Sequence, residues 1–287
     1  MDPFSPELLG GRRVLVTGGG TGLGRAMAGR FLALGADIVI CGRRAAVLES
    51  TASAWSAEAP GLRVATHVCD IRDAEAVEAM MDAIWAEGPL DVLVNNAAAT
   101  FIAQTHRLSA RAADAVLAPT LHGTLYCTLA AGRRWIDGGR PGVVLSVLST
   151  SVITGRAFTV ASAMAKAGVQ AMTRSLAVEW GPRNIRLVAV APGAFPTAGA
   201  QAQLFPSRRA QAVGPGAPKI PLGRNGSHDE LANLAAFMIS DAAAYMTGDT
   251  VVLDGGAHLR TSGAEDLLAW SDEDWTAHRQ NLARPGT

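Results

Sequence analysis

A serine and a lysine stand one helical turn apart, at Ser162 and Lys166. Side chains at this spacing lie on the same face of a helix, so both groups can serve one site. An aliphatic hydroxyl donates a hydrogen bond well but is a poor acid, whereas a phenol with a pKa of about 10 releases its proton beside a cation. The chain has only 2 tyrosines, Tyr126 and Tyr245, and neither occupies this motif. The pair therefore favours stabilisation of a developing oxyanion.

Three further side chains are candidates for the same chemistry. His122 can donate a hydrogen bond or carry a proton, because imidazole titrates near neutral pH. The alternative is a core histidine bonded to a backbone carbonyl. Ser149 and Ser151 follow a β-rich run and can orient a substrate or a water molecule, although serine-rich turns are also ordinary loop chemistry.

A glycine-rich turn, Thr17-Gly-Gly-Gly-Thr-Gly-Leu-Gly24, lies between an apolar run and an alanine-rich helical pattern. Glycines remove the Cβ atoms that would block a tight turn, so backbone N–H groups and a helix N-terminus can approach a pyrophosphate. A glycine cluster alone can be a simple turn, but its place between strand and helix favours a dinucleotide. The turn assigns Gly18, Thr21, Gly22 and Leu23 to the cofactor site.

The nucleotide is indicated by the residues that follow the second β-rich run. An NAD site usually has an acidic residue there, but this chain reads Cys41-Gly-Arg-Arg44 and has no acid before Glu49. Arg43 and Arg44 can bind a 2′-phosphate, and Arg25 could add a second charge. Solvated arginines are the alternative, more so for Arg44 than for Arg43. The sequence predicts NADPH as the cofactor.

Short β-rich runs alternate with helical patterns along the chain. Strands are expected at residues 12–17, 37–41, 62–68, 91–95, 142–147, 185–190 and 250–254. Helices are expected at 22–34, 45–59, 74–86, 111–135, 159–180 and 229–240. Strands without clear alternation, separated by helices, are typical of a parallel sheet covered on both faces. The expected fold class is α/β, a doubly wound, Rossmann-like sheet of seven parallel strands.

Composition excludes several classes of partner. Lys and Arg number 25, as do Asp and Glu, so no net field draws the protein to nucleic acid or an anionic membrane. No apolar run is long enough to span a bilayer, and no signal peptide is visible. The 3 cysteines lack the spacing of a metal site or disulfide frame, which predicts reduced core thiols in a cytoplasmic protein.

The domain organisation is expected to be simple. At 287 residues the chain can form a single domain with one large core. Residues 193–227 are rich in Pro, Gly, Ala and Arg and weakly periodic, which predicts a substrate lid. Residues 257–287 are a polar C-terminal extension.

Chain-wide motifs resemble the short-chain dehydrogenase/reductase family. They are the glycine-rich turn, Asp70-Ile71, Asn95-Asn96-Ala97, Pro192-Gly193 with Thr197, and Asp254-Gly255-Gly256. The resemblance implies that Asp70 and Ile71 meet the adenine and that Asn96 and Ala97 support the cofactor channel. It also implies that Pro192, Gly193 and Thr197 face the nicotinamide, and that Lys166 holds the nicotinamide ribose.

The Ser162-Ala-Met-Ala-Lys166 motif resembles the 2,4-dienoyl-CoA reductase branch of that family, as do residues 95–102, 176–181, 230–237 and the tail at Ser262-Gly263. The branch implies addition of a hydride to the distal carbon of a conjugated thioester, followed by protonation at the α-carbon. In an ungapped match the branch's proton-donating tyrosine falls on Ser151 and its thioester-binding asparagine on His122. Both expected side chains are absent from those positions.

Three hypotheses follow. The first is an NADPH-dependent reductase of an enoyl- or dienoyl-CoA thioester, with Ser162, His122 and Ser151 near the thioester. The second is a carbonyl reductase or alcohol dehydrogenase with an unusual proton donor, and the third is a catalytically silent NADP-binding protein. The lid residues Arg208, Arg209, Lys219 and Arg224 could meet coenzyme A phosphates or be merely solvated. The resemblance further implies a homotetramer built through the fourth and fifth helices, and no metal.

Overall fold

One parallel sheet organises the molecule. The computed structural model describes residues 2–58, 61, 63–204, 220–259, 267 and 269–282. Its 7-stranded sheet has the order β3-β2-β1-β4-β5-β6-β7, and every neighbouring pair is parallel. The strands are β1 (Arg13–Thr17), β2 (Asp37–Gly42), β3 (Val64–Val68), β4 (Val92–Asn95), β5 (Gly142–Val147), β6 (Ile185–Pro192) and β7 (Thr250–Leu253). The predicted Rossmann-like sheet is confirmed.

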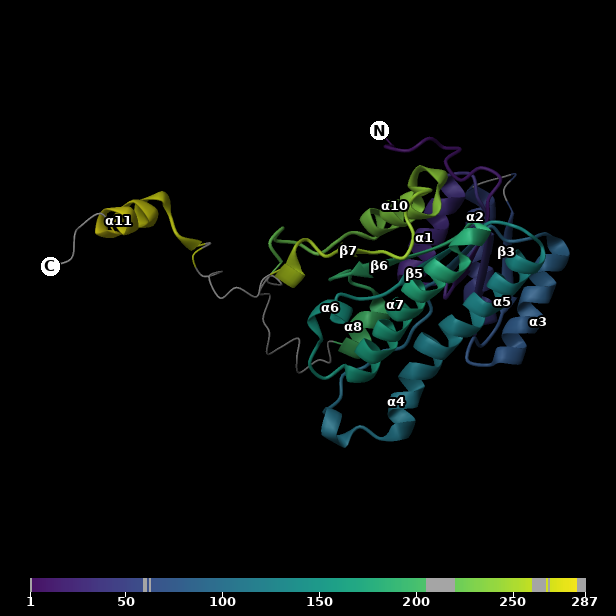
Figure 1. Cartoon of the computed structure of the whole chain (residues 1–287), viewed down its shortest axis with the longest axis horizontal. Helices are drawn as coiled ribbons and strands as arrows, with labels where there is room; N and C mark the ends of the chain where they lie inside the picture. The colour runs from purple at the N-terminus through teal and green to yellow at the C-terminus, as the bar shows by residue number, and fades with distance from the viewer. Residues whose placement is uncertain are drawn as a thin grey trace.

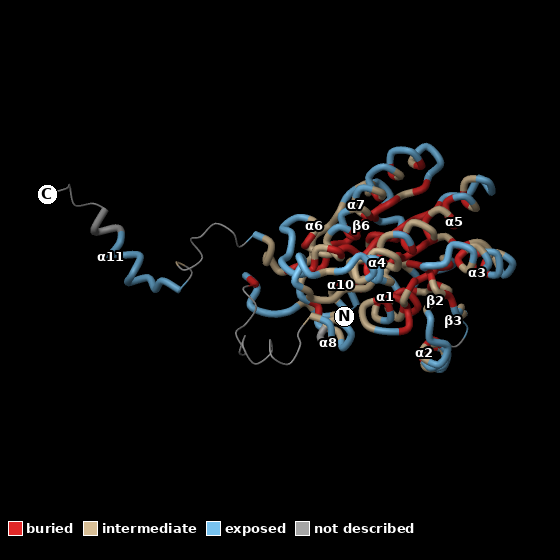
Figure 2. The backbone as a smooth tube through the Cα atoms, turned by 90° about the horizontal axis from the view of Figure 1, so that it is seen from below, coloured by how far each residue is buried: buried red, intermediate tan, exposed pale blue. Residues whose placement is uncertain are grey.

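Helices cover both faces of this sheet (Figure 1). Successive strand residues point to opposite faces, so Val14 and Val16 of β1 join one core and Leu15 joins the other. The first core also contains residues of α1 (Gly22–Ala33), α2 (Ala45–Glu58) and α10 (His228–Ile239). The second contains residues of α3 (Ala74–Glu87), α5 (Gly123–Asp137) and α7 (Val160–Trp180). Figure 2 shows the buried residues along the strands and the inner sides of these helices.

The helix expected over residues 111–135 is divided in the structure. A helix α4 (Ala110–Leu117) runs into a wider π-helical turn, η2 (Ala118–His122), before α5 begins. Pro119 lies in that turn and has no N–H to donate, so regular α-helical hydrogen bonding is interrupted there. The sequence pattern of apolar residues does not show this interruption. The interruption matters for the site, because Thr120, at the centre of the π-helical turn, is fully buried.

The lid and the extension are only partly described. The lid segment contains α8 (Ala198–Leu204) and continues at Ile220, whereas Arg208, Arg209 and Lys219 lie outside the described residues. The extension contains α11 (Asp272–Leu282), and its residues 260–266 and 283–287, which include Ser262 and Gly263, also lie outside them. The proposed division into a single domain, a lid and an extension stays a prediction.

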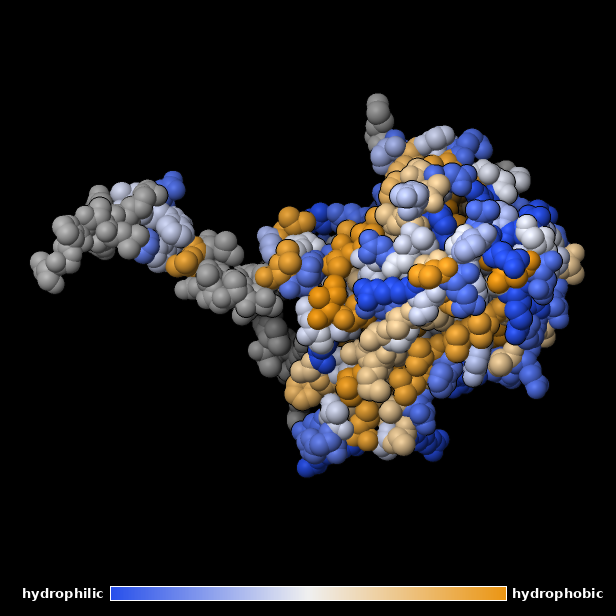
Figure 3. Space-filling view, viewed as in Figure 1, coloured by the Kyte–Doolittle hydropathy of each residue, from blue (hydrophilic) through white to orange (hydrophobic). Residues whose placement is uncertain are grey.

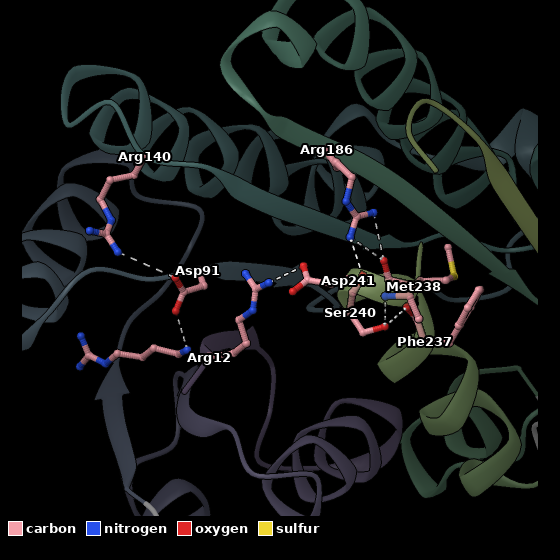
Figure 4. A network of polar contacts seen from close by, with 10 residues as sticks. Arg12, Asp91, Arg140, Arg186, Phe237, Met238, Ser240 and Asp241 are labelled. Carbon is pink, nitrogen blue, oxygen red and sulfur yellow. Dashed lines mark hydrogen bonds and ion pairs between the residues drawn. The ribbon is translucent and has the colours of Figure 1, made fainter. Parts of the chain in front are cut away.

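A polar network holds the amino-terminal edge of the sheet (Figure 4). The backbone N–H of Arg13 donates to Asp91 at 2.8 Å, and Arg12 forms an ion pair of 2.5 Å with Asp241. Arg186, at the start of β6, donates to the carbonyl oxygens of Ser240 at 3.1 Å and Met246 at 3.0 Å. These contacts tie strand starts to the segment after α10. The opposite edge, where the strands end, is available for a ligand, as in other open parallel sheets.

Candidate active site

A cavity of about 1000 Å³ opens at the carboxyl edge of the sheet. Its wall comes from the loops after β1, β2, β3, β4, β5 and β6, together with residues of α7 and α8. Every residue that the sequence assigned to the cofactor lies on this wall: Gly18, Thr21, Gly22, Leu23, Arg43, Arg44, Asp70, Ile71, Asn96, Ala97, Lys166, Pro192, Gly193 and Thr197. The fold therefore brings together residues that are far apart in the chain.

The glycine-rich turn is shaped for a close approach of backbone to ligand. Gly18 and Gly22 have φ values of 66° and 55°, which L side chains rarely adopt. A Cβ at Gly24 would lie 2.4 Å from Nδ2 of Asn96, so only glycine fits there. The helix that follows has no acidic residue in its first turn, and Thr21 at its N-cap makes no side-chain capping bond. Its positive end is thus left to interact with an anion such as a pyrophosphate.

Thr17 joins this turn to the loop after β4. Its Oγ1 accepts hydrogen bonds from the backbone N–H groups of Asn96 and Ala97, both at 3.0 Å, and donates to Val94 O at 3.3 Å. Asn96 completes the junction by donating from Nδ2 to Thr17 O at 2.9 Å. The sequence motif included Thr17 but assigned it no role. A buried hydroxyl at a strand end is the signal that could have identified it.

The end of the cavity beyond β2 and β3 is rich in arginine. Arg43 and Arg44 are exposed on the cavity wall, and Arg72, which sequence analysis did not single out, joins them. Arg72 donates from Nε to Asp70 Oδ1 at 2.9 Å, and this hydrogen bond is the main cause that lowers the pKa of Asp70. Asp70 is therefore held as a carboxylate beside the arginines. No acidic residue lies between the end of β2 and Glu49, and Asp70 is the only acidic side chain among the described wall residues.

The candidate catalytic residues mostly meet at the other end. Ser149, Ser151, Ser162 and Lys166 all line the cavity. Ser162 and Lys166 lie in the first half of α7, and Ser149 and Ser151 stand in the loop and short helix α6 (Ser151–Thr154) that follow β5. Lys166 is buried and donates from Nζ to the carbonyl oxygen of Val147 at the end of β5. Burial lowers the pKa of Lys166 to about 8.

His122 is placed differently from the other candidates. It is exposed, it does not line the cavity, and its ring centroid lies 6.3 Å from that of Tyr126. The π-helical turn explains the placement, because Thr120 takes the inward position. The hydroxyl of Thr120 accepts from Ala99 N at 3.0 Å and donates to Ala99 O at 3.3 Å. The structure therefore does not bring His122 to the serines and Lys166.

Two more residues that sequence reasoning missed lie on the cavity wall. Thr100 and Phe101 follow the Asn-rich turn, line the cavity and are held in place through the Thr120 contact with Ala99. Both residues follow the Asn-rich turn directly in the sequence, which is the signal that could have identified them. Arg25, which was considered for the nucleotide phosphate, does not line the cavity.

Further observations concern the groups that the site does not contain. Neither Tyr126 nor Tyr245 lines the cavity, so a phenol is not among its acids. Among the described residues no group of His, Cys, Asp and Glu could hold a metal ion. In the same part of the chain, no helix combines the length and apolarity needed to cross a bilayer. The described wall thus offers hydroxyls, one buried amine, arginine side chains, one carboxylate and backbone groups for chemistry.

Comparison with known proteins places the molecule in a class. The family model described as enoyl-(acyl carrier protein) reductase matches residues 18–258. A relative in Bacillus subtilis (strain 168), named probable 2,4-dienoyl-CoA reductase, (2E)-enoyl-CoA-producing, is 40% identical over 250 residues, 86% of this chain and 97% of that protein. The L-xylulose reductase of Bos taurus is 34% identical over 248 residues, 86% of this chain and 97% of that enzyme.

A solved structure agrees with the fold. A protein of Beutenbergia cavernae, crystallised with NADP bound at low occupancy, is 30% identical, with a TM-score of 0.80 over 88% of this chain and 99% of that one. The doubly wound sheet and its glycine-rich cavity define a nicotinamide-dinucleotide oxidoreductase. The chain belongs to the short-chain dehydrogenase/reductase family.

The lowered pKa of Lys166 makes stability depend on pH. The folded protein holds this proton up to about pH 8, whereas an unfolded lysine holds it up to its ordinary pKa of 10.5. Between these values the unfolded chain binds more protons, so Lys166 makes the free energy of unfolding rise with pH. We expect the free energy of unfolding of the wild type, minus that of Lys166→Met, to rise by about 3 kcal/mol between about pH 8 and pH 10.5. Urea unfolding without cofactor measures both free energies.

The comparison of wild type with Lys166→Met removes a second pH dependence of stability, which the buried cysteine thiols cause and which has the opposite sign. Burial raises the pKa of Cys41 to about 12 and that of Cys69 to about 11. Their protons are released from the unfolded chain first, so they make stability fall as the pH rises above their unfolded values. Both cysteines remain in Lys166→Met, and subtraction cancels them. Parallel stability curves for the two proteins would contradict the assignment to Lys166.

Proposed function

We propose that the protein catalyses NADPH-dependent reduction of a conjugated enoyl- or 2,4-dienoyl-CoA thioester. One observation carries the proposal: Ser162 and Lys166 line the cavity on one face of α7, and no tyrosine lines it with them. The site offers hydroxyl donors for an oxyanion but no phenol to protonate a ketone oxygen. The relative named as a dienoyl-CoA reductase supports the same substrate class; its (2E)-enoyl product takes the proton at the γ-carbon, whereas the route proposed for this chain protonates the α-carbon.

The reaction needs stabilisation of negative charge on the thioester oxygen. When bound, NADPH supplies a hydride, which the proposed reaction adds to the distal carbon of the conjugated system. Ser162 donates a hydrogen bond to the thioester oxygen as its charge grows, and a preorganised donor of this kind contributes about 3 kcal/mol. Lys166 adds positive charge from the base of the cavity and holds the nicotinamide ribose. Its buried position makes that charge more effective, because little water screens it.

The dienolate also needs a proton at the α-carbon. His122 is exposed and outside the cavity, so we assign this step to the serines on the wall. The Ser151 N–H is directed to Ser149 Oγ at 3.4 Å, which sets the two residues side by side. We propose that Ser149 and Ser151 hold a water molecule that gives a proton to the α-carbon, and that solvent at the open cavity returns a proton to the hydroxide left behind. A serine hydroxyl suits this role, because it both accepts and donates a hydrogen bond.

The residues present fit a bound NADPH. Gly24 leaves no room for a side chain at the turn, and an uncapped helix N-terminus follows it. Arg43 and Arg44 stand on the cavity wall directly after β2, where a 2′-phosphate would require positive charge. The NADP found in the Beutenbergia cavernae structure supports this choice of nucleotide.

Carbonyl reduction is the second candidate. The L-xylulose reductase of Bos taurus favours it, because that relative is named for a carbonyl substrate. The absence of tyrosine from the cavity wall argues against it, since an aliphatic hydroxyl is a weak acid. We therefore rank a thioester first and a carbonyl second.

Assembly and location complete the proposal. Met164 and Val178 of α7 are 57% and 81% exposed, and contiguous apolar surface of this kind marks interaction sites. Figure 3 shows apolar surface along the face where α5 and α7 lie in Figure 1. This surface supports a homotetramer that pairs through these helices. The free, buried thiols of Cys41, Cys69 and Cys127 support a reducing compartment such as the cytoplasm.

The choice of nucleotide predicts a selective effect of Arg43. We expect Arg43→Ala to raise KM for NADPH about tenfold, because a charge-assisted hydrogen bond is lost. KM for NADH, which has no 2′-phosphate, should stay within about twofold. Steady-state kinetics with both nucleotides measure this, and Arg183→Ala is the matched control, because Arg183 is exposed and outside the cavity. An equal rise for both nucleotides would contradict the assignment.

The substrate class is tested by NADPH oxidation with a series of thioesters. We expect turnover with 2,4-hexadienoyl-CoA and none with saturated butyryl-CoA, because only a conjugated thioester accepts hydride at a distal carbon. Ser162→Ala should lower kcat on the order of 100-fold, and Lys166→Ala should lower it further. His122→Ala should retain wild-type activity. Turnover of ketones that survives Ser162→Ala would instead favour the carbonyl reductase.

A further inference from the structure

The loop between α6 and α7 contains a backbone conformation that is rare for its residue type. Phe158 has a φ of 65°, in the left-handed region that L side chains seldom adopt. Of the described non-glycine residues only Asn184 shares this region, and asparagine is enriched there. The carbonyl of Phe158 accepts a hydrogen bond of 3.0 Å from Ala103 N in the loop after β4. The fold thus holds a strained aromatic residue in place, and strain of this kind is concentrated at ligand sites.

A small pocket adjoins the main cavity at Ser162. The pocket and the cavity share Phe101, Thr159 and Ser162 as wall residues, so the pocket is continuous with the proposed reaction site. Most of the remaining wall is apolar, and it includes Leu108, Val116, Phe158 and Val160. None of the described residues that line the pocket is charged. The pocket therefore favours an apolar group over a charged one.

The size of the pocket is set by Phe158. The pocket has a volume of about 10 Å³, which is room for about one water molecule. Phe158 is 56% exposed although it lines the pocket, so its ring forms part of the outer wall. The wall residues Val116 and Ala161 are buried in the protein. Loss of the Phe158 side chain would thus enlarge the pocket toward solvent and leave the buried part of its wall intact.

The position of the pocket matches one end of the proposed substrate. When a thioester oxygen accepts a hydrogen bond from Ser162, the carbons of its acyl chain lie within a few bonds of the shared wall. The coenzyme A part carries phosphates, which an uncharged pocket does not suit. Arg224, which sequence analysis considered for those phosphates, forms an ion pair of 2.7 Å with Glu230 and lines neither the pocket nor the cavity. The pocket suits the apolar end of the acyl chain.

We propose that Phe158 is a specificity-determining residue that limits the length of the acyl chain, because its ring bounds the apolar pocket that takes the distal end of that chain. The hydrogen bond from Ala103 keeps the strained backbone, and with it the ring, in this position. A short dienoyl chain fits, whereas a longer one meets the ring. The inference rests on the proposed function for the thioester, but binding of the chain does not require turnover.

The test compares dienoyl thioesters of different length in wild type and Phe158→Ala. We expect wild type to have the higher kcat/KM for 2,4-hexadienoyl-CoA and the lower one for 2,4-decadienoyl-CoA. Phe158→Ala should raise kcat/KM for the decadienoyl ester on the order of tenfold, which is the effect of burying about two more methylene groups. It should leave kcat/KM for the hexadienoyl ester within about twofold.

Three further variants serve as controls. Phe158→Leu keeps most of the bulk and should gain less than Phe158→Ala. Phe158→Gly removes the ring and also relieves the strain at positive φ, so it should have the longer-chain preference and a higher Tm than Phe158→Ala. Ile153→Ala is the matched control, because Ile153 is 52% exposed on α6 and lines neither the pocket nor the cavity. Wild-type length preference in both Phe158→Ala and Phe158→Gly would overturn the role of Phe158.

A binding measurement keeps the test independent of the reaction. Butyryl-CoA and decanoyl-CoA, which are saturated, are titrated calorimetrically into the NADP-loaded protein. Phe158→Ala should strengthen the binding of decanoyl-CoA on the order of tenfold and leave that of butyryl-CoA within about twofold. This result without reduction of any dienoyl thioester would support the pocket, and the proposed function alone would fail. Reduction of both dienoyl thioesters with an unchanged length preference would overturn the role of Phe158 alone.

Discussion

The junction between β1 and β4 is the constraint on which the cofactor half of the site depends. Thr17 ends β1, and its hydroxyl holds the backbone of Asn96 and Ala97 after β4, while Asn96 returns a hydrogen bond to the Thr17 carbonyl. These two strands are neighbours at the centre of the sheet, and the chain leaves them in opposite directions. Such a reversal opens a crevice between the flanking loops. The buried hydroxyl fixes the width of that crevice, because any movement would leave polar groups unpaired.

The substrate half depends on a comparable contact. Thr120, in the π-helical turn, holds both polar groups of the Ala99 backbone and thus sets the positions of Thr100 and Phe101. On the facing wall, Lys166 is tied to the end of β5 through the carbonyl of Val147. A buried amine with a pKa of about 8 can carry charge at neutral pH, but the fold loses stability to keep it there. That cost is consistent with a functional cation rather than a packing residue.

Replacement of a phenol by a hydroxyl at Ser162 changes what the site can do. A tyrosine beside Lys166 would be an acid, whereas a serine there remains a neutral donor. A donor without acidity suits a thioester enolate, whose oxygen needs stabilisation while the proton goes to carbon. The proposed chemistry thus follows from one side chain, and the surrounding fold is shared with relatives of different names, such as L-xylulose reductase.

Sequence patterns were sufficient for the strands and for gathering the predicted cofactor residues on one cavity wall, because both depend on local signals. The β-rich runs lie between glycine turns, and Arg43 and Asp70 are adjacent to strand ends, where position in the sequence fixes position in space. His122, which an ungapped count selected, lies outside the cavity, and Thr120 is the buried residue of the same π-helical turn. Thr120 was missed because its role depends on a contact with the loop at Ala99, which is distant in the sequence. The lid arginines Arg208 and Arg209 lie outside the described residues.

Deuterium transfer tests the central claim of conjugate thioester reduction most directly. The enzyme is given 2,4-hexadienoyl-CoA and NADPH that carries deuterium at the transferable position of the nicotinamide, and the product is analysed by NMR. The account predicts deuterium at the distal carbon of the former conjugated system and a solvent-derived proton at the α-carbon. Deuterium on the carbonyl carbon, or none in the product, would contradict it.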